Sequence, residues 1–161
     1  MGKKIFIIYG HHNIKESFNA SIRDAFIEEA KNVGHEIDLI NLHEEKQLDF
    51  YNGTPPNEQV LNYRERLEKC DVMFMISPCY NLRATAILEN WIDLVLAPKW
   101  FFAFKRVVGN WGYPVPGAMK NKLAIMSMSY GGNIFSIQTW FQNMPFRSCL
   151  LYTSDAADDL V

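Results

Sequence analysis

The chain has 161 residues, and its 16 Lys and Arg residues nearly balance its 18 Asp and Glu residues, giving a formal net charge of −2. A chain of this length is expected to form one domain, large enough to bury a core without disulfides or a structural metal. The charge balance gives no sign of a nucleic-acid-binding surface. The three cysteines, Cys70, Cys79 and Cys149, lack the spacing of a zinc site or a disulfide framework.

The apolar segments are too short for membrane insertion. None approaches the ~18 residues of a membrane span, and the run after Lys3 and Lys4 stops at Gly10, short of a signal-peptide core. We therefore expect a reduced, cytoplasmic compartment and no transmembrane segment.

The first half of the chain alternates between strand and helix patterns. Residues 5–8 form a continuous apolar run, which predicts a strand buried on both faces. Ser17 is a favourable N-cap for a helix with apolar residues every four positions, which Gly34 ends. Strict alternation over 36–42 predicts a half-buried edge strand. A polar surface connection, 43–56, and an exposed amphipathic helix, 57–69, are expected to follow.

The second half continues the alternation. Residues 72–76 predict a central strand, and the apolar spacing of residues 86–95 predicts a helix that ends before Pro98. Residues 123–126 predict a third buried strand that runs on to Tyr130. The pair Gly131-Gly132 then predicts a turn into another helix, which carries Ile134, Ile137 and Trp140. Strands and helices in this order predict an α/β fold, with a parallel sheet covered by helices on both faces.

One stretch, residues 100–116, interrupts this pattern. It mixes six aromatic residues with glycines and prolines, so we expect an irregular loop. Such a loop either serves the function or covers an exposed end of the sheet with its rings.

The C-terminus has an unusual sequence. Residues 149–159 resemble the translation, in one reading frame, of the transposase adapter used in DNA sequencing libraries. We therefore expect a native domain of residues 1–148, cut short near Ser148, and a non-native tail of residues 149–161.

Three loops that follow the predicted buried strands suit a bound nucleotide. These loops, 10–19, 77–85 and 129–133, are expected at the carboxyl edge of the sheet, where open parallel sheets bind ligands. In the first loop a strand, a polar turn and a helix N-terminus follow one another, which makes an anion site. The chain has no G-x-G-x-x-G after the first strand, no P-loop motif, and no acidic residue there for a phospho-receiver. A flavin nucleotide is the better prediction.

Four motifs together resemble one family. They are Tyr9-Gly10-His11-His12 with Ser17-Phe18-Asn19, Ser77-Pro78-Cys79-Tyr80, the helix from Ala86-Ile87-Leu88 to Trp91-Ile92-Asp93, and Tyr130-Gly131-Gly132. In this combination the chain is similar to the flavodoxin-like NAD(P)H:quinone oxidoreductases over nearly all of residues 3–141. The resemblance implies a three-layer α/β/α fold of strand order 2-1-3-4-5, with FAD or FMN as cofactor and NAD(P)H as co-substrate. It also implies ping-pong hydride transfer to a quinone, and a homodimer with the site near its interface.

The same resemblance assigns cofactor-binding positions by motif. The phosphate-binding turn corresponds to His12, Ser17, Phe18 and Asn19, with His11 replacing His12 if the loop is shifted. The loop along the flavin ring corresponds to Pro78, Cys79, Tyr80, Asn81 and Leu82. The loop at the polar edge of the ring corresponds to Ser129, Tyr130, Gly131 and Gly132. No metal site is expected, because adjacent histidines such as His11 and His12 diverge on a turn.

Two departures from the family pattern limit what the resemblance implies. Asn81 and Leu82 stand where many members place aromatic residues, and Phe135 and Phe141 stand at the positions of a tyrosine–histidine relay. The relay is therefore not carried over, the catalytic residues stay unassigned, and main-chain N–H groups near the Gly131-Gly132 turn are expected to stabilise the reduced flavin instead. The family's fifth strand and last helix are expected to be missing beyond Ser148.

Two other functions are compatible with the same motifs. One is a regulatory flavoprotein resembling the accessory subunits of bacterial potassium-efflux systems, and the other is a one-electron flavodoxin-like carrier. The sequence leaves open the choices between FAD and FMN and between NADH and NADPH, and does not identify the physiological acceptor.

Overall fold

The computed structural model describes residues 2–50, 53–81, 83–109 and 111–131. By its internal contacts the chain divides into two units, Met1–Ser129 and Tyr130–Val161. All strands and helices named below belong to the first unit. The expected helix with Ile134, Ile137 and Trp140 and the expected tail lie outside the described residues.

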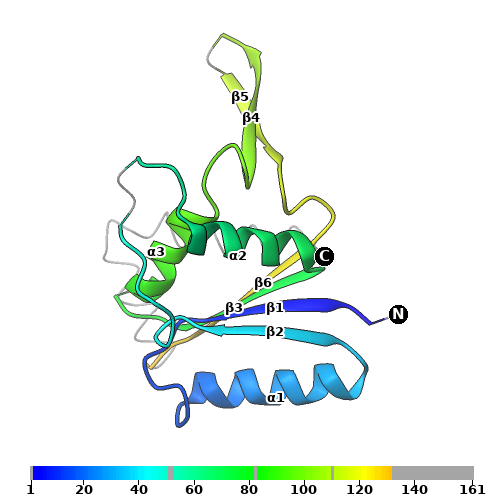
Figure 1. The fold of residues 1–161 in the computed structure, drawn as a ribbon, viewed down its shortest axis with the longest axis vertical. Coiled ribbons are helices and arrows are strands. Elements are labelled where there is room, and N and C mark those ends of the chain that lie inside the picture. Colours follow the sequence, from blue (N-terminus) through cyan, green and yellow to red (C-terminus); the bar gives the residue numbers. More distant parts are fainter. Residues whose placement is uncertain (1, 51–52, 82, 110, 132–161) are drawn as a thin grey trace, which may run out of the picture. The chain divides into compact units, whose positions relative to one another are not determined.

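A parallel sheet of four strands forms the centre of the first unit (Figure 1). Its order is β2 (Glu36–Asn41), β1 (Lys4–Tyr9), β3 (Val72–Pro78) and β6 (Leu123–Ser129). This confirms the first four positions of the expected order 2-1-3-4-5, because β6 is the fourth strand along the chain to join this sheet. β1 and β3 are its inner strands, as their continuous apolar runs predict.

Helices cover both faces of this sheet (Figure 1). α1 (Phe18–Asn32) packs on the face formed by Ile5, Ile7 and Tyr9 of β1. α2 (Glu58–Lys69) and α3 (Ala86–Val95) pack on the opposite face, over Phe6 and Ile8. Alternate residues of one strand thus enter two separate cores, which confirms the predicted three-layer α/β/α arrangement.

The helix ends follow the signals seen in the sequence. Ser17 Oγ accepts a hydrogen bond from the N–H of Ala20 (3.0 Å) and caps α1. Asn57 Oδ1 accepts one from the N–H of Val60 (2.9 Å) and caps α2. After α1, Gly34 takes a φ of +84°, a left-handed conformation that glycine adopts without strain.

The expectation of an irregular loop over residues 100–116 is wrong. β4 (Phe102–Val108) and β5 (Trp111–Pro116) form an antiparallel hairpin instead. A Cβ added to Gly112 would lie 2.5 Å from the carbonyl oxygen of Lys105, so glycine lets the two strands approach. Phe104 and Trp111 are 67% and 81% exposed, so most of the surface of these two rings faces solvent.

The burial expected for residues 123–126 is also wrong. They form part of β6 as predicted, but Leu123 and Met126 are 56% and 43% exposed. In the described part of the chain β6 is an edge strand, paired only with β3. A short apolar run cannot distinguish an inner strand from an edge strand, because both kinds of strand can consist of consecutive apolar residues.

Tyr63 of α2 gives the fold a measurable dependence on alkaline pH. It is 1% exposed and packs against Trp91, and its hydroxyl donates to Glu45 Oε2 (2.9 Å). Burial, aided by the hydrogen bond with Glu45, raises the pKa of Tyr63 to about 12. The unfolded tyrosine titrates near ~10, so its contribution to stability is fully present below pH 10 and is lost between pH 10 and 12.

We expect Tyr63→Phe to flatten this part of the pH profile. Between pH 10 and 12 the free energy of unfolding of the unmodified protein should fall by about 2–3 kcal/mol more than that of the variant. Urea denaturation at pH 9, 10, 11 and 12 measures the difference. Tyr113→Phe, which changes a tyrosine that is 49% exposed, serves as the matched control and should leave the profile unchanged.

Candidate functional site

The carboxyl edge of the sheet brings together segments that lie far apart in the sequence. β1, β3 and β6 end there at Tyr9, Pro78 and Ser129. The N–H of Cys79 donates to the carbonyl oxygen of Ser129 (2.8 Å), and Thr85 Oγ1 donates to the carbonyl oxygen of Gly10 (2.6 Å). The loops predicted to form the site are therefore joined directly to one another.

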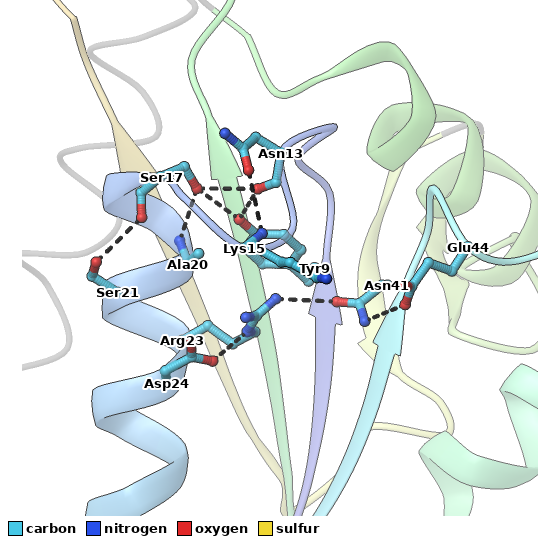
Figure 2. A network of polar contacts seen from close by, with 10 residues as sticks. All are labelled: Tyr9, Asn13, Lys15, Ser17, Ala20, Ser21, Arg23, Asp24, Asn41 and Glu44. Carbon is cyan, nitrogen blue, oxygen red and sulfur yellow. Dashed lines mark hydrogen bonds and ion pairs between the residues drawn. The ribbon is translucent and has the colours of Figure 1, made fainter.

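The turn between β1 and α1 is organised around Asn13 (Figure 2). Its side-chain oxygen accepts from the N–H groups of Lys15 (3.2 Å) and Glu16 (2.8 Å). Its carbonyl oxygen accepts from the hydroxyl of Tyr9 (2.9 Å), the last residue of β1. This local network fixes the turn before any ligand binds.

At the end of this turn, the first turn of α1 presents unpaired donors. Ser17 Oγ is occupied by its cap and lies 3.0 Å from the hydroxyl of Tyr9. The N–H groups of Phe18 and Asn19 have no acceptor in the part of the chain that the structure describes. Phe18 is 71% exposed, so this helix N-terminus is open. Free N–H groups and the positive end of the helix dipole together favour an anion here.

Asn19 links α1 to β6. Its Nδ2 donates to Ser129 Oγ (2.8 Å), across 110 positions of sequence. The side chain is buried, and within the described ranges its Oδ1 has no hydrogen-bond partner. The Asn19 amide thus holds two elements together at the carboxyl edge and leaves one buried acceptor for a donor.

Arg23 also lies at this edge, although the sequence motifs did not identify it as a site residue (Figure 2). Its guanidinium lies 4.6 Å from the ring centre of Tyr9, and it bonds to Asn41 Oδ1 (3.3 Å) and Asp24 Oδ1 (2.7 Å). It is only 7% exposed. One sequence signal for its burial was available: Arg23 lies three residues after Ala20, on the same inner face of α1.

The adjacent histidines do not diverge as expected: their rings stack on each other, with centres 4.4 Å apart. His11 is buried, and its Nδ1 lies 3.0 Å from the N–H of Asn13, whereas His12 is exposed. The hydroxyl of Tyr80 lies 3.4 Å from His11 Nε2 and 3.5 Å from His12 Nδ1. Both imidazoles therefore lie beside the predicted ring-binding loop, and either could contact a ligand there.

His43, which the sequence did not single out, completes a small histidine cluster. Its ring centre lies 6.4 Å from that of His12. Burial lowers the pKa of the His43 imidazole, and the neighbouring His12 and His11 lower it further, which favours the neutral ring. Among the residues that the structure describes, no group of three or more His, Cys, Asp or Glu side chains could hold a metal ion.

The predicted ring-binding loop is a tight turn. Pro78 is buried at the end of β3, Cys79 is half-buried, and Tyr80 is 45% exposed. The backbones of Tyr80 and Arg83 exchange two hydrogen bonds (2.9 and 3.2 Å). Between them Asn81 has a φ of +51°, a left-handed conformation that asparagine tolerates better than an aromatic residue does. Leu82 lies outside the described residues.

The third predicted loop is described only in part. Ser129 is the last residue of the first unit and accepts the bonds from Asn19 and Cys79. Tyr130 and Gly131 are exposed and belong to the second unit. Gly132 and the relay positions Phe135 and Phe141 lie outside the described ranges.

Comparison with known proteins gives a family match over most of the chain. A family model described by its flavodoxin-like fold matches residues 3–159. Ribosyldihydronicotinamide dehydrogenase [quinone] of Mus musculus is 27% identical over 156 residues, covering 81% of this chain and 64% of its own length. FMN-dependent NADH:quinone oxidoreductase of Clostridium perfringens is 28% identical over 160 residues, covering 91% of this chain and 74% of its own.

Solved structures share the fold. NAD(P)H:quinone oxidoreductase from Methanothermobacter marburgensis superposes with a TM-score of 0.70 at 18% identity, covering 94% of this chain and 78% of that one. An FMN-dependent NADH-azoreductase from Bacillus anthracis, solved with FMN, gives 0.61 at 15% identity, covering 81% and 70%. This chain spans under two-thirds of the length of the mouse relative.

Proposed function

Because the chain belongs to the family with the flavodoxin-like fold, we propose that it is a flavin-dependent oxidoreductase that carries electrons from NAD(P)H to a quinone. The names of the mouse and Clostridium relatives support this assignment. The observation that carries it furthest is the convergence of the loops after β1 and β3 with the last residue of β6, Ser129, beside an open helix N-terminus. Ligands of open parallel sheets bind at such an edge.

The residues at this edge fit a flavin nucleotide. The free N–H groups of Phe18 and Asn19 suit its phosphate, and the buried Oδ1 of Asn19 would accept one more donor. Tyr80, close to both histidines, provides an aromatic surface for its ring. Bound there, a flavin would supply the hydride chemistry, while the chain's own residues orient it and set its surroundings.

We favour FMN over FAD, because the Clostridium relative is named as FMN-dependent. The choice can be tested by heating the purified protein and separating the released flavin by chromatography. Recovery of FAD alone would contradict it.

We further propose that the active form is a homodimer, as the resemblance implies, and that residues 149–161 are not native. The family match runs on to residue 159 and so gives no boundary at Ser148. Sequencing the parent gene across codon 148 tests the second point. In the described residues no helix is long and apolar enough to cross a membrane, and the cytoplasmic location stays a prediction.

The visible spectrum of the full-length parent protein is the first test of the function. We expect a yellow protein, or one that takes up FMN or FAD, whose flavin absorbance bleaches when NADH or NADPH is added without oxygen. Menadione should then restore the absorbance. A colourless protein that accepts no flavin would contradict every flavin function, including the carrier and the accessory subunit. A bound flavin that neither nicotinamide reduces would leave only those two alternatives.

A further inference from the structure

Arg23 places a buried positive charge on the inner side of α1 (Figure 2). Arginine side chains are seldom buried unless they are paired. In the described part of the chain its ion pair is with Asp24, whose side chain is 60% exposed, whereas that of Arg23 is 9% exposed. Water screens the exposed carboxylate more than it screens the buried guanidinium. The pair therefore leaves a positive field on the side of α1 that faces the sheet.

Two further contacts fix where the guanidinium lies. Its central carbon, Cζ, is 4.6 Å from the centre of the Tyr9 ring, which is within the range of a cation–π interaction. Nη1 donates to Asn41 Oδ1 (3.3 Å) at the end of β2, and the Asn41 amide in turn donates to Glu44 Oε2 (2.6 Å). Tyr9 is fully buried at the end of β1. Arg23 thus holds the Tyr9 ring from the side of α1.

The Tyr9 hydroxyl connects this cation to the turn before α1. It donates to the carbonyl oxygen of Asn13 (2.9 Å) and lies 3.0 Å from Ser17 Oγ. The same Ser17 Oγ accepts the N–H of Ala20 and caps the helix. A displaced Tyr9 ring would move the turn and the cap together. Because donors bind a ligand well only when they are held within about 0.5 Å of the right geometry, the contact with Arg23 affects the free N–H groups of this helix N-terminus.

The charge of Arg23 also acts on the helix N-terminus directly. Arg23 lies six residues after Ser17, which is about 9 Å along the helix axis. Helical side chains lean toward the N-terminus, so the guanidinium is expected to lie nearer than that. This separation is within the Debye length of ~10 Å at 0.1 M salt. The positive charge therefore adds to the helix dipole in favouring an anion.

We propose that Arg23 is a positioning residue for the phosphate group of the ligand. Through Tyr9 it holds the turn in its binding geometry, and its charge makes the site prefer a phosphate monoester to an uncharged ligand. The inference rests on the anion site of the proposed function. It assigns a role to a residue outside the motifs and requires no contact between Arg23 and the ligand.

The first test adds inorganic phosphate to the flavin-free full chain and follows the amide signals of Phe18 and Asn19 by ¹H–¹⁵N NMR. We expect saturable shifts. Arg23→Met, which removes the charge but keeps an apolar side chain, should weaken phosphate binding about tenfold, and Arg23→Lys should restore it to within about threefold. A side chain needed only to fill space would give no advantage to lysine over methionine.

The second test compares FMN with riboflavin, which lacks the phosphate. Both affinities are measured by the quenching of flavin fluorescence. Arg23→Met should weaken FMN binding about tenfold and riboflavin binding by less than about twofold. Arg23→Gln, which also removes the charge but keeps a side-chain donor for Asn41, has the same expected result and replaces the methionine variant if that protein does not fold.

Arg66→Met is the matched control. The Arg66 guanidinium likewise lies over a ring of β1, with Cζ 4.5 Å from the centre of the Phe6 ring, and Nε donates to Asp38 Oδ2 (2.9 Å). Phe6 belongs to the core on the other face of the sheet. The control thus removes the same kind of contact away from the turn. It should bind phosphate and FMN within about twofold of the unmodified protein, whatever its stability.

Several results would overturn the proposal: no saturable phosphate shift at Phe18 and Asn19, unchanged affinity in a folded Arg23→Met protein, a loss that Arg23→Lys does not restore, or equal losses for FMN and riboflavin. A protein that binds phosphate with the expected dependence on Arg23 but takes up no flavin would reject the proposed function and keep the role of Arg23. FMN binding that is unaffected by Arg23→Met would do the reverse, so the two failures can be told apart.

Discussion

Replacing both Ser17 and Asn19 by alanine is expected to weaken flavin binding by on the order of a hundredfold. Ser17 caps α1 and Asn19 ties its first turn to Ser129, so the double change loosens the turn that offers its N–H groups to the phosphate. Affinity is measured by titrating the flavin-free protein with FMN and following the quenching of flavin fluorescence.

Ser21→Ala is the control for this prediction. Ser21 lies one turn further along α1 and its exposed hydroxyl bonds to the carbonyl oxygen of Ser17 (3.3 Å), so the same serine-to-alanine change leaves the cap in place. Its flavin affinity should stay within about twofold of the unmodified protein. If the Ser17→Ala, Asn19→Ala protein binds flavin as well as Ser21→Ala does, the phosphate site has been placed wrongly.

Truncating Leu88 to alanine is expected to lower the free energy of unfolding by about 3–4 kcal/mol. Leu88 is fully buried in α3, in the core shared with Phe6 and Trp91. It also supports the turn after β1, because a Cβ added to Gly10 would lie 3.0 Å from Leu88 Cβ. The loss should appear in urea unfolding curves as a lower midpoint with an unchanged slope.

Leu61→Ala provides the matched comparison, since it deletes the same atoms from a residue of α2 that is 50% exposed. Its cost should be below about 1 kcal/mol. Equal losses for the two variants would contradict the assigned core. A loss confined to Leu88→Ala, accompanied by weaker flavin binding, would connect this core to the candidate site.

Periodicity was enough to predict the positions of the sheet strands and the helices, although β6 exposes Leu123 and Met126 of its apolar run. The hairpin over 102–116 was not predictable in the same way. Pro114 and Pro116 argue against an inner strand, and they are tolerated here because, among the described residues, β5 pairs only with β4. Because the aromatic rings of the hairpin are exposed, its sequence lacks the apolar–polar alternation on which the prediction of a half-buried strand depends.

The candidate site was predictable as far as it lies in local motifs. Ser17 and the two histidines lie at the predicted edge because the strand–turn–helix order places them there. Arg23 contacts Asn41, which lies 18 positions further along the chain, and His43 contacts His12, which lies 31 positions earlier. Both separations are longer than a local sequence pattern covers. Such contacts form only once the sheet and its helices are packed, so the spacing of residues in one sequence does not predict them.

Ser129 has a consequence for the order in which the protein is made. A ribosome releases the chain from its N-terminus, so Asn19 and Cys79 emerge long before their shared partner, which lies 110 positions beyond Asn19. Closing so long a loop is slow, because its entropy must be overcome before the contact forms. β6 is therefore the last strand to join the sheet during synthesis, and until it does the Asn19 amide that bonds to Ser129 stays in contact with water.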